Sequence, residues 1–429
     1  IVNAACTALV YVTARRVADI EQSVLAAALY AFLSLGIGVN GVFAHATHFV
    51  VLFALIGLSL LPGPADAPRL VPLFISGLSL GTAFMMKQHG APYIVFAGAY
   101  LLWHYRYGPE IPRFRRGTGL ALFSAGVFLP FLIVCLIVWR AGVFDKFWFW
   151  TFEYARAYIG QTTIGEIPGS ILRGIKEVAW GSSLLWLLAL AGLGAAVREK
   201  GSGRLVIALF VATLAAVSPG FYFRGHYFVL MLPVVALLSA QGAYAIARIA
   251  PKSWGFFVPF LLVGAGILQG VLMQFGFFFV MSPSELSRRI YGANPFPESI
   301  EIARYLKGHT RPEDRIGILG SEPQICFYSE RRSVTPFAYM YPLMEDHPFA
   351  ADPQAELIRD FETRRPAYIV YVAGPLSWGL IGTSEKRIMD WIPGFLSEHY
   401  EQVGLIEIAN RETRYYWDDA QIGRQPRSP

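Results

Sequence analysis

Long apolar runs alternate with short polar segments through the first two thirds of the 429-residue chain. A membrane-spanning helix needs about 20 mostly apolar residues, and fewer when the interface supplies its last turn. Ten runs meet or approach this length, and each predicts a helix. They cover residues 1–14, 23–39, 48–61, 70–86, 91–105, 117–140, 181–197, 204–218, 226–247 and 255–281. The pattern predicts a polytopic α-helical membrane protein with about ten helices.

The pattern changes after Pro283 to shorter alternations of helix and strand. Amphipathic periodicity predicts helices over residues 298–307, 354–364 and 385–398. Short apolar runs predict strands over 315–320, 367–372, 403–408 and 413–417, the last two paired as a hairpin that turns at Asn410-Arg411. We therefore expect a transmembrane domain over 1–281 and a soluble α/β domain over 282–429.

Composition and charge support this division. Hydrophobic residues make up 55% of the chain and charged residues only 15%, which excludes an ordinary soluble protein of this length. Residues 1–281 hold 19 Lys and Arg against 9 Asp and Glu, whereas residues 282–429 hold 17 against 21. The net charge of +6 does not indicate nucleic-acid binding, because the basic residues stand in short loops between apolar runs.

Basic residues occur in every second loop, and cytoplasmic loops are the ones that retain Lys and Arg. The basic loops contain Arg15 and Arg16, Arg69, Arg106 with Arg113, Arg115 and Arg116, Arg198 with Lys200 and Arg204, and Arg248 with Lys252. This side is expected to be cytoplasmic. The soluble domain is then extracytoplasmic, on a multi-pass protein of the plasma (inner) membrane.

The outward loop 141–180 is rich in aromatic residues in its first half. Tryptophan and tyrosine mixed with charged residues favour a helix that lies in the membrane interface. Anchoring is the favoured interpretation of this loop. The alternative is that the same aromatic side chains form one lip of a lipid-facing cavity.

Polar and cationic residues gather at the outward ends of the predicted helices, where the positive-inside bias does not explain them. They are His45 and His48, Lys87 and Gln88, Glu153 and Arg156, and Tyr222, Arg224, His226 and Tyr227. A single lysine at a helix end can be a snorkelling anchor. Several cations at one membrane face instead suit a phosphate or diphosphate headgroup.

His45 and His48, three residues apart, could share a helical face and ligate a metal. No third ligand stands nearby, and Cys6, Cys135 and Cys326 are far apart. No metal site or cofactor is predicted, although a divalent metal stays open. The Ser321-Glu322-Pro323 and Arg331-Arg332 segments are interpreted as turn and surface residues, with acceptor recognition as the weaker alternative.

These residues resemble those of the family 39 type of GT-C glycosyltransferases, which are related to protein O-mannosyltransferases and to the bacterial aminoarabinose transferase of lipid A. The resemblance extends over nearly the whole chain. It is carried by Ala14-Arg15-Arg16, the segment 43–49, Gly81-Thr82-Ala83-Phe84 before Lys87-Gln88, Phe223-Arg224-Gly225-His226-Tyr227-Phe228 with Leu232-Pro233, Gly320 to Ile325, and Arg365 to Val370.

The resemblance implies a GT-C-like helical bundle that moves a sugar from a polyprenyl-phosphate donor to a lipid, glycan or protein acceptor at the extracytoplasmic face. Lys87, Arg224, His226 and Tyr227 would bind the donor phosphate. His45, His48, Gln88, Glu153, Arg156 and Tyr222 would line the substrate site.

The family takes its catalytic carboxylate from the first outer loop. The chain begins Ile-Val-Asn inside an apolar run, and we expect the N-terminal helices and that loop to be missing. The catalytic residue is therefore unassigned, and this segment alone is expected to be inactive. Relatives also place an acidic residue just before the helix that starts here at Phe49, where this chain has Thr47 between two histidines.

Two other functions remain open. A transporter or flippase for lipid-linked sugars should carry paired polar groups near the middle of the membrane and inverted repeats, and neither is visible in the sequence. A non-catalytic membrane scaffold would fit the absence of an identified carboxylate.

Overall fold

The computed structural model describes residues 1–429 except 161, 252, 410–411, 423 and 425–429. The described chain forms two compact units, Ile1–Phe279 and Val280–Pro429. We call them unit 1 and unit 2 and describe each by itself.

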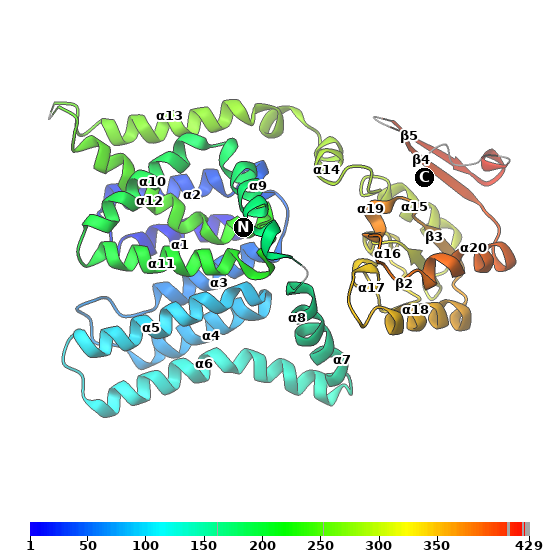
Figure 1. The fold of residues 1–429 in the computed structure, drawn as a ribbon, viewed down its shortest axis with the longest axis horizontal. Coiled ribbons are helices and arrows are strands. Elements are labelled where there is room, and N and C mark those ends of the chain that lie inside the picture. Colours follow the sequence, from blue (N-terminus) through cyan, green and yellow to red (C-terminus); the bar gives the residue numbers. More distant parts are fainter. Residues whose placement is uncertain (161, 252, 410–411, 423, 425–429) are drawn as a thin grey trace. The chain divides into compact units, whose positions relative to one another are not determined.

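Unit 1 is a bundle of helices that run roughly parallel or antiparallel to one another (Figure 1). Its first half contains α1 Val2–Ala14, α2 Ile20–Leu33, η1 Ile37–Val39, α3 Ala46–Ser59, α4 Leu70–Met86, η2 Gln88–Gly90, α5 Ala91–Tyr107 and α6 Arg113–Arg140. Its second half contains α7 Phe144–Trp148, η3 Phe149–Glu153, α8 Tyr154–Ile159, η4 Ile164–Glu166, α9 Ile167–Trp180, α10 Ser183–Arg198, α11 Ser202–Val217, η5 Pro219–Phe221, η6 Gly225–Met231, α12 Leu232–Ala247, α13 Val258–Met273 and η7 Gly276–Val280.

Each of the ten apolar runs contains a helix, but in the runs 23–39, 226–247 and 255–281 the α-helix begins or ends six or more residues inside the predicted bounds. Among the described residues, only Arg113–Arg140 and Gly225–Ala247 are long and apolar enough to cross a membrane by themselves. The bent pair Ile164–Trp180 and Ser183–Arg198, which turns by 112°, could count as a third span. Six apolar helices are shorter, at 13 to 17 residues. Such helices rise only about 20–26 Å, against a hydrocarbon core of about 30 Å.

Breaks near the helix ends explain much of this shortening. The run 23–39 is interrupted after Leu33, and η1 then ends at Asn40, whose φ is 53°. The run 226–247 begins as the 3-10 helix η6 and becomes α-helical only at Leu232. The run 255–281 ends α13 at Met273 and continues as a π-helical turn. Apolar composition alone does not mark such changes in backbone geometry.

Small residues let neighbouring elements of unit 1 approach closely. In the pair α10 and α12, a Cβ on Gly192 would lie 1.9 Å from the Leu238 carbonyl oxygen, and one on Gly242 would lie 1.9 Å from the Leu188 carbonyl oxygen. Close approach of this kind is typical of helices that pack through small side chains. The same feature holds η6 in place, because a Cβ on Gly225 would lie 2.1 Å from the Gly38 carbonyl oxygen.

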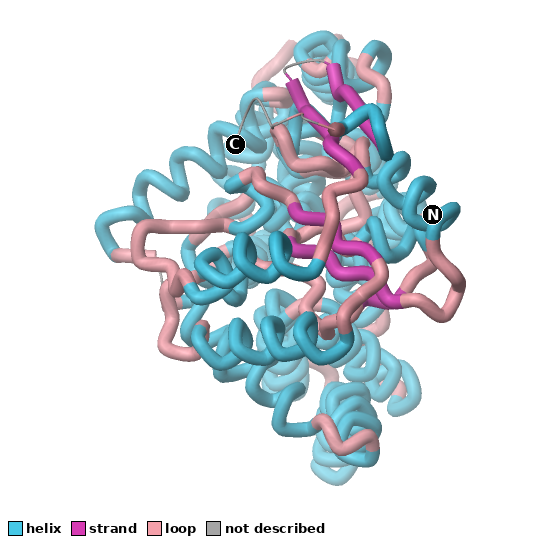
Figure 2. The backbone as a smooth tube through the Cα atoms, turned by 90° about the vertical axis from the view of Figure 1, so that its right-hand side faces the viewer, coloured by secondary structure: helices cyan, strands magenta, loops and turns pink. Residues whose placement is uncertain are grey.

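Unit 2 is a small α/β domain with two separate sheets, which are drawn in magenta in Figure 2. Its helices are α14 Pro283–Tyr291, α15 Ser299–His309, α16 Gln324–Ser329, α17 Tyr341–Met344, α18 Ala351–Arg364, α19 Pro375–Trp378, α20 Arg387–His399 and η8 Asp418–Gln421. Its strands are β1 Arg315–Leu319, β2 Arg332–Ser333, β3 Tyr368–Tyr371, β4 Gly404–Ala409 and β5 Glu412–Trp417.

The parallel sheet has the order β2-β1-β3, with Ile316 opposite Ser333 and Tyr368. The central strand β1 alternates its side chains between two apolar clusters: Ile316 and Ile318 belong to one, and Leu319 belongs to the other. Strands β4 and β5 form the antiparallel hairpin that the sequence predicts. Its predicted turn at Asn410-Arg411 lies outside the described residues.

The interpretation of Ser321, Glu322 and Arg331 as surface residues is wrong. Their exposed fractions are 4%, 1% and 7%. The Arg331 guanidinium donates to the Thr310 hydroxyl at 2.8 Å and to the Thr310 carbonyl at 2.7 Å, so it caps the end of α15. The Ser377 hydroxyl accepts from the Ser321 amide at 2.8 Å and donates to Glu322 Oε2 at 2.7 Å. Tertiary packing, which local polarity does not reveal, covers these groups.

Replacement of Gly225 should weaken unit 1. We expect Gly225→Ala to lower the unfolding free energy by about 1–3 kcal/mol, because the new methyl group would meet the Gly38 carbonyl and the Glu177 carboxylate. Gly264→Ala on α13 is the matched control, since a Cβ there meets nothing within 4 Å. Thermal midpoints measured in detergent would test this. Equal midpoints for both variants would contradict the packing.

Glu322 should make unit 2 less stable at higher pH. Burial raises the pKa of this carboxyl to about 7, so the folded chain holds its proton more tightly than the unfolded chain does. The resulting penalty is absent below the unfolded pKa of about 4.3 and complete above the folded pKa. We therefore expect Glu322→Gln to gain roughly 1–3 kcal/mol over the parent between pH 4.5 and pH 8. A pH-independent difference in thermal midpoint would contradict this assignment.

Candidate functional site

The segment from Pro219 to Met231 is not α-helical and consists of the short 3-10 helices η5 and η6, joined by residues 222–224. It lies at the end of unit 1 where α4 also ends. Gly220, Phe221 and Phe223 have φ values of 70°, 55° and 45°, in the left-handed region that bulky residues avoid. For Phe221 and Phe223 this conformation costs about 1–3 kcal/mol each, which surrounding contacts must offset, whereas glycine adopts it readily. Tyr222 is held by stacking on Tyr158, at 4.9 Å between ring centroids, and by donating its hydroxyl to the Tyr158 carbonyl at 2.9 Å.

Two cations lie against tyrosine rings at this end of the bundle. Lys87 directly follows α4, and its Nζ lies 4.1 Å from the centre of the Tyr227 ring. The guanidinium carbon of Arg224 lies 4.9 Å from the centre of the Tyr222 ring. The negative face of an aromatic ring attracts a cation by about 0.5–2 kcal/mol, depending on how far the pair is removed from water. The tyrosines thus hold both cations without neutralising them.

His89 and His226 contact the Tyr227 ring, and His45 contacts His226. The His45 ring stacks on the His226 ring at 4.6 Å, and both His226 and His89 meet the Tyr227 ring edge-on at 4.7 Å. His48 is buried in the first turn of α3. Among the described contacts, His45 Nε2, His89 Nε2 and both ring nitrogens of His48 have no hydrogen-bond partner.

The local environment opposes positive charge at this cluster. Burial, reinforced by the Arg224 charge, lowers the pKa of Lys87 to about 8. Burial and the nearby Lys87 also lower the pKa of His45, and they lower that of His89 to about 3. These two histidines are therefore neutral at pH 7. Lys87 is still charged at pH 7, but its pKa lies only about one unit higher. An anion bound beside Lys87 would restore the ordinary pKa of the lysine.

A cavity of about 320 Å³ opens beside Lys87. Polar groups on one side come from Lys87, Gln88 and His89, while the other side is formed by aromatic rings from α4, α6 and the 141–180 segment. Those rings belong to Phe84, Phe131, Phe147, Trp150 and Phe152. Gln88 donates its amide to the Thr151 carbonyl at 2.7 Å and so ties the two sides together. This volume lies at the lower end of the range typical of small-molecule sites.

The structure brings most of the sequence-predicted residues together. Ring and cation contacts join Lys87, Tyr227, His226 and His45 in one group, and Arg224 and Tyr222 in another. The charge of Arg224 acts on Lys87, and Gln88 lines the cavity. Glu153 and Arg156 are exposed on η3 and α8, and in the described part of the chain no ion pair joins either one to the cluster.

Several residues of the site were missed from the sequence. Phe131 lies in the middle of a long apolar helix, where nothing in the sequence distinguishes a lipid-facing ring from one that lines a cavity. Glu177 on α9 packs over Gly225, with Oε1 2.8 Å from the position of a Cβ there. The aromatic pattern of the 141–180 segment was a usable signal, and the cavity lining matches the second interpretation given to it.

The sequence leaves open a divalent metal at His45 and His48. Within the described ranges, no group of three or more His, Cys, Asp or Glu side chains could hold a metal ion. His45 and His226 stack face to face, which points their nitrogens along their own ring planes and not at a shared centre.

The comparison with solved structures found oligosaccharyltransferases of Archaeoglobus fulgidus. The apo oligosaccharyltransferase of Archaeoglobus fulgidus superposes with a TM-score of 0.45 and 13% identity, covering 82% of this chain and 56% of that chain. The enzyme from the same organism in complex with an inhibitory peptide and a dolichol-phosphate gives a TM-score of 0.45 and 11% identity, with the same coverage of 82% and 56%. This chain therefore spans little more than half the length of these structures.

The comparison with protein families concerns the N-terminal third of the chain. No curated protein matches the chain. Residues 1–141, which include His45, His48, Lys87 and Gln88, match the model of a family described as dolichyl-phosphate-mannose-protein mannosyltransferase. The resemblance to GT-C glycosyltransferases is thereby confirmed over residues 1–141, which are similar to the dolichyl-phosphate-mannose-protein mannosyltransferase family.

Proposed function

We propose that this protein is a membrane glycosyltransferase that moves a sugar from a polyprenyl-phosphate donor to an acceptor at the extracytoplasmic face. One observation carries the proposal: Lys87 lies on the Tyr227 ring and also lines a cavity with polar groups on one side and aromatic rings on the other. A sugar attached through phosphate to an isoprenoid chain presents a phosphate for Lys87, hydroxyl groups for the polar side and apolar surface for the aromatic rings.

The charge balance of the site favours a phosphate ligand. In the described part of the chain, no carboxylate forms an ion pair with Lys87 or Arg224. The two cations also repel each other, since Arg224 contributes to the lowered pKa of Lys87. A phosphate between them would relieve this repulsion and form charge-assisted hydrogen bonds of about 1.5–3 kcal/mol each.

The same cations suit the proposed chemistry. Transfer breaks the bond between the anomeric carbon and the phosphate oxygen, and the phosphate leaves with the bonding electrons. The acceptor oxygen bonds to that carbon, and its proton passes to the carboxylate that the family resemblance implies. Lys87 and Arg224 would stabilise the charge that develops on the departing phosphate.

Membrane insertion of unit 1 is part of the proposal. Helix α6 is the longest apolar helix described, and only 11% of its most apolar stretch is buried within the chain. Leu132, Leu136 and Ile137 on its surface are more than half exposed. Lipid would cover these side chains. We further propose that the basic loops face the cytoplasm, that unit 2 is extracytoplasmic and that the protein resides in the plasma membrane.

Loss of either cation should reduce transfer. We expect Lys87→Met and Arg224→Ala each to lower the rate at least tenfold, because each removes a charge that stabilises the departing phosphate. Arg140→Ala is the matched control, since Arg140 is an exposed cation at the end of α6. The complete protein would be assayed in detergent with radiolabelled polyprenyl-phosphate sugars.

Unchanged transfer in both cation variants would remove the phosphate assignment. If the parent protein binds the donor lipid but never releases its phosphate, the transporter or scaffold hypothesis is favoured over the enzyme.

Donor binding should weaken at high pH. Lys87 carries its charge below a pKa of about 8 and loses it as the pH rises. A polyprenyl-phosphate sugar is a phosphodiester whose single charge is constant from pH 7 to pH 9. We expect the dissociation constant to rise severalfold over this range, and to stay flat in Lys87→Arg because a guanidinium remains charged. An equal pH dependence in both proteins would assign the titration to another group.

A further inference from the structure

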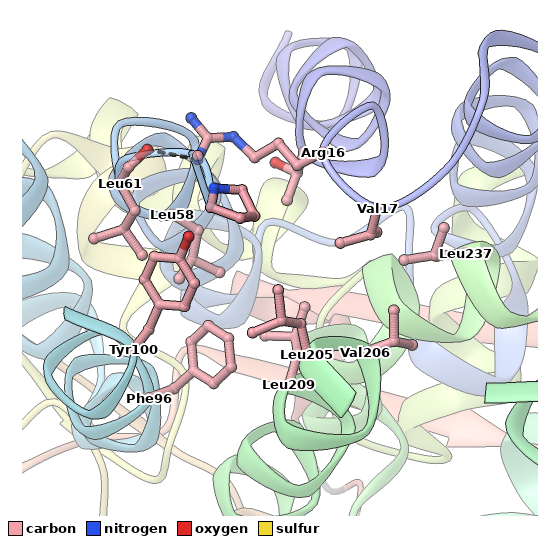
Figure 3. A pocket seen from close by; sticks show the side chains of 13 residues that line it. Arg16, Val17, Leu58, Leu61, Phe96, Tyr100, Leu205, Val206, Leu209 and Leu237 are labelled. Carbon is pink, nitrogen blue, oxygen red and sulfur yellow. Dashed lines mark hydrogen bonds between the residues drawn. The ribbon is translucent and has the colours of Figure 1, made fainter. Parts of the chain in front are cut away.

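A second cavity lies in unit 1 at the far end of α3 from the histidine cluster. His45 precedes α3 at the cluster, and Leu58 at the other end of the helix lines this cavity. The 14 residues of α3 separate the two places by about 20 Å. Figure 3 shows the cavity between α1, α5 and α11, with the Arg16 side chain at its edge.

The interior of this cavity is apolar. Phe96 and Tyr100 come from α5, Leu205 and Leu209 from α11, and Leu237 from α12 (Figure 3). The polar atoms at its wall are already satisfied within the protein. The Tyr100 hydroxyl donates to the Pro62 carbonyl at 2.6 Å, and the Thr13 hydroxyl donates to the Leu9 carbonyl at 2.7 Å. A polar ligand would lose its hydrogen bonds to water there without replacing them.

Arg16 is the exception at the rim. Its Nη1 donates to the Leu61 carbonyl at 2.5 Å and its Nη2 donates to the Ser59 carbonyl, which fixes the guanidinium at the end of α3. A guanidinium has five N–H donors. In the described part of the chain, the other Arg16 donors have no protein acceptor, and the side chain is exposed. An anchored cation with unused donors is suited to a phosphate.

Other charges near Arg16 leave this role possible. Asp66 lies on the 60–66 loop, where its Oδ2 accepts from the Gly63 amide at 3.1 Å. No ion pair joins Asp66 to Arg16 among the described residues. Arg15 adds a second positive charge beside Arg16 and donates to the Ala18 carbonyl at 3.0 Å.

We infer that this cavity, which we call the Arg16 cavity, binds one acyl chain of an anionic phospholipid whose phosphate contacts Arg16. The volume of about 80 Å³ suits a segment of a single chain and is a quarter of that beside Lys87. The charge agrees with the proposed topology, in which Arg15, Arg16 and Arg69 face the anionic cytoplasmic leaflet. This inference depends on the proposed membrane insertion and does not depend on sugar transfer.

The test uses the complete protein in vesicles of phosphatidylcholine and phosphatidylglycerol that contain a trace of phosphatidylglycerol with a diazirine on its acyl chain. After irradiation, we expect crosslinked peptides to map to residues 96–100 and 205–209. Labelling spread evenly over the exposed faces of α6 and α13 would overturn the inference. Unlabelled lipids would then be added as competitors. If polyprenyl phosphate abolished the crosslinking and phosphatidylglycerol did not, the inference would also be overturned, because the cavity would then bind the donor lipid.

Two variants make the test specific. Leu209→Trp should fill the Arg16 cavity and reduce crosslinking at least fivefold, whereas Leu268→Trp on the exposed surface of α13 should leave it within twofold of the parent. Arg16→Gln should reduce the phosphatidylglycerol label about three- to tenfold and leave a phosphatidylcholine label unchanged, and Arg16→Lys should restore part of the loss. Equal labelling in all variants would overturn the inference. The peptide map of the parent protein decides the question if a variant fails to fold.

Discussion

The placement of two cations beside tyrosine rings, with no ion pair to a carboxylate among the described residues, is the constraint on which the candidate site depends. Lys87 and Arg224 come from segments separated by more than 130 residues, and each lies over a ring that attracts its charge. Burial and repulsion between the two cations raise the free energy of the charged state, which is why the pKa of Lys87 is lowered. Our proposal that the site binds an anion rests on this arrangement, because an anion would supply the missing neutralisation.

The backbone geometry of residues 219–231 is what places Arg224 and the two tyrosine rings in this arrangement. A continuous α-helix through residues 219–231 would not place Tyr222, Arg224 and Tyr227 as the strained path does, with Phe221 and Phe223 in left-handed conformations. The stacking of Tyr222 on Tyr158 and the close packing of Gly225 against Gly38 hold this path. Contacts from α8 and η1 therefore offset the strain that positions the cations.

The two cavities of unit 1 differ in a way that matches their proposed ligands. Beside Lys87 the lining combines unneutralised polar groups with aromatic rings, whereas the wall of the Arg16 cavity offers apolar surface and a single cation with unused donors. Helix α3 connects the two, since it begins directly after His45 and ends beside Arg16. One short helix thus separates a site proposed for a sugar-bearing lipid from one proposed for an ordinary phospholipid.

The sequence by itself determined the helical character of unit 1, the main strands of unit 2 and the polar residues that gather around Lys87. These follow from local periodicity: the run 70–86 coincides with α4, whereas the α-helices in the runs 23–39, 226–247 and 255–281 begin or end six or more residues inside the predicted bounds. The tertiary structure decided what depends on residues distant in sequence: the breaks within apolar runs, the burial of Glu322 and Arg331, the exposure of Glu153 and Arg156, and the aromatic wall of the cavity. Hydrophobicity predicts that Phe131 avoids water, but only packing decides whether its ring meets lipid, protein or a cavity.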